Sequence, residues 1–135
     1  MIEIFTDAST IVQMGISGWA ALIRYPKGTI AELKGTEICG CINRMELLAV
    51  IKALSTVKGC DEITIYTDSQ YVMRGSRQFK KADNNYDLWE QLNRLKTKYY
   101  VSFVWVRSHS GHPDNQWVDR MARKAARNRI RGMYA

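Results

Sequence analysis

The chain has 135 residues, and its 46% hydrophobic and 24% charged residues exclude a disordered protein. The length predicts a single domain, residues 1–135, and no apolar run approaches the roughly 18 residues of a membrane helix, so no membrane partner is expected. The net charge of +7 favours an anionic partner, with nucleic acid first.

The first half of the chain predicts three strands and then a helix. Apolar and polar residues alternate at residues 2–6, and two further strand patterns, at 18–25 and 29–38, flank a Pro-Lys-Gly turn signal. These three strands are expected to form an antiparallel meander. Residues 43–54 change to helical spacing, with residue types that favour a helix.

The second half predicts two strands and three helices. Strand patterns lie at residues 62–67 and 99–106, and helical patterns lie at 69–79, from 87 onward, and at 114–130. The first of these helices is expected to break near Gly75, and Asp87 with Glu90 fits a capping box. The order β-β-β-α-β-α-α-β-α predicts an α/β protein, with a mixed sheet and helices on its faces.

Two of the predicted strands end in similar segments. The segment FTDAS places Asp7 at the end of the first strand, and YTDSQYV places Asp68 at the end of the fourth. If these strands are neighbours, both carboxylates lie at the same edge of the sheet, where α/β proteins collect functional groups. A structural turn can use Asp, but two matching segments indicate a shared site.

Two further acids lie on predicted helices among apolar residues. Glu46 is placed in the first turn of its helix, where an acid can simply favour the helix dipole. Asp119 lies one turn into the last helix, where an ion pair with Arg123 is the simpler explanation. Neither residue alone indicates a site.

The four acids together, Asp7, Glu46, Asp68 and Asp119, need a common explanation. Like charges held close repel one another unless cations neutralise them. Carboxylate oxygens suit Mg²⁺ or Mn²⁺, and a pair of such ions is a recurrent device for attack on a phosphodiester. The sequence therefore predicts two metal ions held by acids in a basic protein that binds phosphates.

The segment RSHSGHPDN, residues 107–115, adds His109 and His112 in a loop rich in Gly, Ser and Pro. A histidine can transfer protons near neutral pH. A loop histidine is most often only solvated, but this loop directly precedes the helix that carries Asp119. The two interpretations of His109 stay evenly balanced on these grounds.

The segments FTDAS, NRMEL, YTDSQYV, DLW and HSGHPDNQWVD, taken together and in this order, resemble the signature blocks of type 1 ribonuclease H. The blocks span residues 5–119. The resemblance implies a ribonuclease H-like fold, a five-stranded mixed sheet of order 3-2-1-4-5 flanked by helices. It also implies an endonuclease, expected to be a monomer, that hydrolyses the RNA strand of RNA/DNA hybrids.

The resemblance also implies a role for individual residues. The metal-binding acids of the family match Asp7, Glu46, Asp68 and Asp119, and its catalytic-loop histidine matches His109. Polar residues that contact the hybrid in its minor groove, where 2′-hydroxyls are displayed, match Asn43 and Gln70. The aromatic residue near the DNA-strand channel matches Trp89.

The chain departs from the family pattern at three places. Ala8 stands where the family usually has Gly, so a positive φ there would strain the backbone. Cys41 and Ile42 replace polar residues, which puts part of the contacts to DNA phosphate and groove in doubt. Finally, the basic helix and loop that bacterial members often carry before the DLW block is missing.

Two basic surfaces are candidates to replace that protrusion. Lys80 and Lys81 lie in the shortened connection before the DLW block and are slightly favoured. The last helix carries basic residues three or four apart, which can equally be a solvated face: Arg120, Arg123, Lys124, Arg127 and Arg131.

Three cysteines, Cys39, Cys41 and Cys60, make an odd number, and no export signal precedes the first strand. A reduced, cytoplasmic protein is the simplest interpretation. Cys39 and Cys41 lack the C-x-x-C spacing of zinc sites, and no histidine lies near them in sequence, so a zinc site is not expected.

Other functions stay open beside the enzyme. A non-catalytic hybrid-binding module of the same fold is disfavoured because all four acids are present. The HSGHPDN loop and the NRMEL block argue against integration or resolution of nucleic acids. The ribonuclease H domain of a reverse transcriptase also lacks the protrusion in many cases, although Met1 and the compact length favour a free-standing enzyme.

Overall fold

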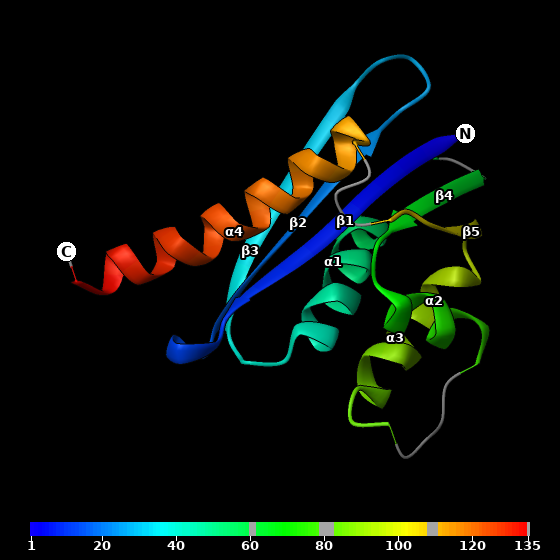
Figure 1. Ribbon diagram of the computed structural model, residues 1–135. Coiled ribbons are helices and arrows are strands. Elements are labelled where there is room, and N and C mark those ends of the chain that lie inside the picture. Colours follow the sequence, from blue (N-terminus) through cyan, green and yellow to red (C-terminus); the bar gives the residue numbers. More distant parts are fainter. Residues whose placement is uncertain (60–61, 79–82, 108–110, 135) are drawn as a thin grey trace.

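A computed structural model describes residues 1–59, 62–78, 83–107 and 111–134 (Figure 1). Its five strands are β1 (Ile2–Ile11), β2 (Ile16–Arg24), β3 (Ile30–Ile38), β4 (Glu62–Thr67) and β5 (Tyr100–Trp105). Its helices are the short 3₁₀ helix η1 (Val12–Met14), α1 (Ile42–Thr56), α2 (Gln70–Arg77), α3 (Tyr86–Lys96) and α4 (Pro113–Tyr134). Among these described residues, no helix is both long and apolar enough to cross a membrane.

The strands form one mixed sheet in the order β3-β2-β1-β4-β5, which confirms the predicted fold class. Strand β2 pairs antiparallel with β1 and with β3, as expected for a meander with short connections. Strand β4 pairs parallel with β1 and with β5, and helices make these crossovers. Strand β1 therefore lies at the centre of the sheet, where the antiparallel and parallel halves meet.

The two faces of the sheet carry separate layers of helices (Figure 1). Helix α4 packs across β1, β2 and β3 on one face, and α1 packs across β1 and β2 on the other. Successive side chains of a strand point to opposite faces, so Ile4 joins the core under α1 while Phe5 joins Val118 and Ala122 under α4. Gly18 brings α4 close, because a Cβ there would lie 2.1 Å from the Ala122 carbonyl oxygen.

Three details of the predicted elements are wrong. Strand β1 does not end near Asp7 but continues to Ile11, because β2 offers a pairing partner along its whole length. Helix α2 passes through Gly75 without a break. The capping box is not formed, since α3 begins at Tyr86 and Asp87 instead accepts hydrogen bonds from Arg44, at 2.7 and 3.0 Å.

Candidate active site

Asp7 lies in the part of β1 that extends beyond its pairing with β4. Strand β4 pairs with β1 only from Ile2 to Phe5, so the edge of β1 beyond Phe5 is open on that side. Asp68 directly follows the last residue of β4 and therefore lies beside this opening. The adjacency of the two strands brings Asp7 and Asp68 together, as the matching segments predict.

Glu46 reaches the same place from α1. The helix begins at Ile42, so Glu46 lies beyond its first turn, and the prediction of a first-turn position is wrong. An explanation by the helix dipole, which acts at the first turn, is therefore weakened. Glu46 is only 7% exposed because α1 packs this side against the sheet, with Met45 and Leu47 buried beside it.

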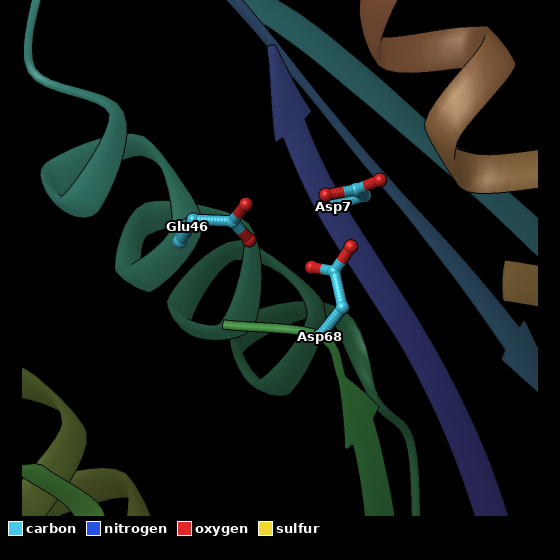
Figure 2. Close-up of side chains that lie close together, drawn as sticks. All are labelled: Asp7, Glu46 and Asp68. Atoms are coloured by element: carbon cyan, nitrogen blue, oxygen red, sulfur yellow. The ribbon is translucent and has the colours of Figure 1, made fainter. Parts of the chain in front are cut away.

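The carboxylates of Asp7, Glu46 and Asp68 form one cluster, in which an oxygen atom from each lies within 4.8 Å of the other two. Figure 2 shows the three groups pointing toward one another from β1, α1 and the end of β4. Asp7 is 4% exposed, and its Oδ1 accepts a hydrogen bond from the Ala8 N–H at 2.9 Å. Glu46 Oε2 is buried and has no hydrogen-bond partner within the described ranges.

The cluster resists full ionisation. Burial, followed by the charge of Asp68, raises the pKa of Asp7 from 3.8 to about 8. Burial and the charges of Asp7 and Asp68 raise the pKa of Glu46 well above its usual value. All three groups can be ionised near neutral pH only if positive charge enters between them, which is the electrostatic signature of a cation site.

Asp119 lies on α4 and is not one of the three acids in this cluster. One of its oxygens accepts an ion pair from Arg123 Nε at 3.2 Å, as the simpler explanation predicted. Its charge nevertheless makes the smallest of the named contributions to the raised pKa of Asp7, so Asp119 lies close enough to act on the cluster. Its role as a fourth ligand stays a prediction.

His109 lies outside the described residues, but the loop's second histidine, His112, does not. The His112 ring packs on the stacked rings of Phe5 and Tyr66, with centroids 5.1 and 6.1 Å away, and its Nδ1 is buried without a hydrogen-bond partner among the described residues. Asp114 accepts two hydrogen bonds from Arg24, at 2.7 and 2.8 Å.

The Arg24–Asp114 pair fixes the first turn of α4 to the end of β2 and thereby the end of the histidine loop. Sequence reasoning missed this pair because its partners lie 90 positions apart. An acid in the first turn of a helix was the only local signal, and it does not name a partner.

Asn43 and Gln70 are exposed near the starts of α1 and α2, where a large ligand can reach them. Gln70 also lines a hollow of about 220 Å³ with Arg74, Arg77 and Trp105. Their contact with substrate stays a prediction.

Trp89 does not fit the predicted position at a substrate channel. Its side chain is 1% exposed, and its Nε1 donates to the Tyr71 hydroxyl at 2.9 Å. Its ring fills the space above Gly75, where an added Cβ would lie 2.0 Å from the indole. We therefore assign Trp89 to the core, because a buried ring cannot stack on a nucleic acid.

The departures at Ala8, Cys41 and Ile42 have different consequences. Ala8 lies inside β1, paired with Trp19, and its Cβ packs with Met45 and Ala49, so the extended backbone carries no strain. Cys41 is the residue before α1 and makes no side-chain cap, and Ile42 is 39% exposed, so neither supplies the polar contact that the family pattern has there.

Two basic surfaces, the Lys80–Lys81 pair and the basic side of α4, are candidates to replace the missing protrusion. Lys80 and Lys81 lie outside the described residues. The five basic residues of α4 are all exposed, along the side that faces away from the sheet. Exposure is what both a solvated face and a phosphate-binding face require, so the choice between them stays open to experiment.

Comparison with known proteins finds relatives along most of the chain. Residues 1–127 match the family model described as RNase H. The chain is 38% identical to a ribonuclease H of Nitrosospira multiformis, over 100% of this chain and 95% of the relative. It is 39% identical to a ribonuclease H of Paramagnetospirillum magneticum, over 91% and 88% of the two chains.

Two solved structures share the fold at lower sequence identity. The N-terminal RNase H domain of a Mycobacterium tuberculosis protein has a TM-score of 0.83 at 23% identity, over 98% of this chain and 97% of that one. LC11-RNase H1, solved in complex with an RNA/DNA hybrid, has a TM-score of 0.78 at 20% identity, over 96% and 99%.

Proposed function

Because the chain belongs to the RNase H family and is a ribonuclease H, we propose that it hydrolyses the RNA strand of RNA/DNA hybrids at Asp7, Glu46 and Asp68. One observation carries the proposal: three separate elements bring these carboxylates within 4.8 Å of one another, and two of them are buried. A purely structural role does not account for this arrangement, since buried like charges destabilise a fold.

The donor atoms fit a hard divalent cation. All three are carboxylate oxygens, and the buried Glu46 Oε2 has no hydrogen-bond partner in the part of the chain that the structure describes. Such oxygens suit Mg²⁺ or Mn²⁺. We assign the cluster to two such ions, with Asp119 as a further ligand. When bound, these ions activate water and stabilise the charge that develops on a phosphodiester.

The protein's own part is to hold these oxygens on rigid elements. Asp7 is fixed by the pairing of β1 with β2 and by the Ala8 N–H. Glu46 is fixed by the packing of α1 on the sheet. We assign to His109 the transfer of a proton near the cleaved bond, because its loop leads directly into the helix that carries Asp119.

The substrate is assigned from the family and from the surface around the cluster. LC11-RNase H1 binds an RNA/DNA hybrid and has the same fold. Asn43 and Gln70 are exposed on the two helices that follow β3 and β4, and side chains of this type can bond the 2′-hydroxyls of a hybrid minor groove. The net charge of +7 favours binding to phosphates.

The test compares labelled RNA/DNA, RNA/RNA and DNA/DNA duplexes, each with Mg²⁺, with Mn²⁺ and with a chelator. We expect cleavage of the RNA strand of the hybrid, only when metal is present, and none of the DNA duplex. Asp7→Asn, purified in parallel, controls for contaminating nucleases. Cleavage without metal, or equal cleavage by Asp7→Asn, would contradict the proposal.

The remaining expectations are separate proposals with separate tests. A single domain over residues 1–135 predicts one cooperative unfolding transition. A monomer predicts a sedimentation or scattering mass close to the 15.5 kDa of the chain. The cytoplasmic location is tested by fractionation of cells that express the protein.

A further inference from the structure

Two thiols outside the acid cluster lie side by side at the start of α1. The backbone N–H of Cys41, the residue that precedes the helix, donates to Cys39 Sγ at 3.2 Å, and only Gly40 separates the two cysteines. Both are free thiols, and Cys41 is exposed while Cys39 is half-buried. A small molecule can therefore reach the pair.

The pair lies beside a cation and the start of a helix, although Arg44 is also ion-paired with Asp87. The positive charge of Arg44 acts on both thiols, and the amino end of α1 has no side-chain cap to compete for its N–H groups. A cation and a helix N-terminus both stabilise a thiolate. A hydrogen bond with Cys39, more than any other contact, raises the pKa of the Cys41 thiol.

We propose that Cys39 and Cys41 are a redox-active dithiol that exchanges with low-molecular-weight disulfides. The Cys39 thiolate attacks one sulfur of the small disulfide, whose S–S bond breaks, and the released thiolate takes up the proton that Cys39 gave up. The Cys41 sulfur then attacks Cys39 Sγ and expels the second small thiol, which takes the Cys41 proton. The protein is oxidised by two electrons, and one small disulfide is reduced to two thiols.

The resulting bond is expected to be reversible. Apart from Cys39 and Cys41, no atom of the described residues lies within 4 Å of the position that a Cβ on Gly40 would occupy, so the rest of the protein does not crowd the segment that must rearrange. A ring across one intervening residue is strained, and strained or exposed disulfides are the easily reduced, labile ones. Such a pair responds to the thiol–disulfide balance and contributes little permanent cross-linking.

Ring closure would act on the start of α1. The Cys41 carbonyl accepts the Met45 N–H at 3.1 Å, which is the first bond of the helix. Moving Cys41 moves that turn, including Asn43, which the proposed function assigns to substrate contact. Resting on that assignment, we expect oxidation to weaken hybrid binding several-fold.

The chemistry is tested by mass spectrometry on the full chain with Cys60→Ser, which leaves only these two thiols. The protein is incubated with oxidised glutathione, blocked with iodoacetamide and digested with trypsin, which releases both cysteines in the peptide of residues 35–44. We expect this peptide to lose the mass of two hydrogen atoms, to take up no blocking group, and to recover with dithiothreitol. Cys41→Ser should instead accumulate glutathione on Cys39, and a peptide that stays fully blocked would overturn the proposal.

The consequence for binding is measured separately, with Asp7→Asn added so that the hybrid is not cut. Oxidised protein should bind hybrid several-fold more weakly than reduced protein, and the double variant Cys39→Ser/Cys41→Ser should not respond to oxidant. Equal affinity of the two forms would overturn the binding consequence. The mass measurement needs no nuclease activity, so a failure of the dithiol and a failure of the proposed function remain distinguishable.

Discussion

Two polar regions of this molecule, one half-buried and one buried, differ in how their hydrogen bonds are satisfied. At the half-buried Tyr71 hydroxyl, polar groups of α2 and from the start of α3 bond one another. The hydroxyl donates to Asp83 Oδ1 at 2.8 Å and accepts from Asn85 Nδ2 and Trp89 Nε1, both at 2.9 Å. We call these four residues the Tyr71 network. A satisfied network of this kind orders the helices around it.

The carboxylate cluster is the opposite case. Asp7 and Glu46 are buried beside Asp68, their pKa values are raised, and none of the described residues bonds Glu46 Oε2. The protein thus completes the Tyr71 network with its own groups but leaves the cluster incomplete. The difference indicates that the cluster is arranged for a ligand from outside, whereas the network serves the fold.

The largest effect is expected from Asp7→Asn. It removes one negative charge from the cluster and weakens the hold on cations that supply several kcal/mol of transition-state stabilisation. We expect hybrid cleavage to fall by about 10³-fold or more. Single-turnover cleavage of labelled hybrid in Mg²⁺ measures this loss.

Asp83→Asn is the matched control, because it makes the same chemical change in the Tyr71 network. It should lower stability and leave the cleavage rate of the folded protein within a few-fold of the unaltered chain. If the two substitutions reduce cleavage equally, the division between a functional and a structural region is wrong.

The second-largest effect is expected on stability, from a substitution of Trp89. The family resemblance places this residue near the substrate, whereas the structure places it in the core. Trp89→Ala should lower the free energy of unfolding by about 3–5 kcal/mol, as for other buried aromatic residues. Urea unfolding monitored by circular dichroism measures it. Hybrid affinity of the folded variant should change little, and a large loss of affinity with unchanged stability would restore the substrate role.

The cluster could be predicted because its signals are local. Asp7 and Asp68 each follow a run of strand residues, and Glu46 is an acid among apolar helix positions, so each is visible in a short segment. The order of the sheet came from the family resemblance and not from periodicity. The strand pairing seen in the structure then brings the separate segments together.

The features that could not be predicted depend on distant partners. The continuation of β1 to Ile11 depends on pairing with β2. Helix α2 continues through Gly75, where the ring of Trp89 from α3 occupies the space beside the glycine. The expected capping box is absent because α3 begins at Tyr86, and Asp87 instead bonds Arg44, which lies 43 positions before it. Local propensity cannot report such contacts, since it describes only neighbours along the chain.

A third prediction uses the pH dependence of the metal-free protein. The folded state holds protons on Asp7 up to about pH 8, whereas the ordinary pKa is 3.8. Above the ordinary value the unfolded state has released its proton, so this group's stabilising contribution is greatest at low pH and falls as pH rises toward 8. One such group changes the free energy of unfolding by at most about 1.4 kcal/mol per pH unit.

We therefore expect the unaltered chain, in chelator, to lose about 2–3 kcal/mol more than Asp7→Asn between pH 5 and pH 7. Urea unfolding at several pH values measures the difference, and comparison with Asp7→Asn cancels the titrating groups outside the carboxylate cluster; Glu46, whose pKa the charge of Asp7 helps to raise, is counted with Asp7. Added Mg²⁺ should reduce the loss in the unaltered chain. Parallel pH profiles for the two proteins would show that Asp7 is not held in its protonated form.

The smallest effect is expected from Tyr71→Phe, which tests the Tyr71 network. The ring stays, but Trp89 Nε1 and Asn85 Nδ2 lose their acceptor and Asp83 loses a donor. Buried polar groups left without partners cost about 1–3 kcal/mol, and the half-buried position of Tyr71 places this case near the lower end. Thermal unfolding should show a lower Tm with unchanged cleavage by the folded protein. In metal-free buffer, Asp7→Asn should raise the Tm because it removes a repelling charge from the carboxylate cluster, whereas Tyr71→Phe should lower the Tm. Opposite signs of these two Tm shifts would support the comparison of the two regions, and equal signs would contradict it.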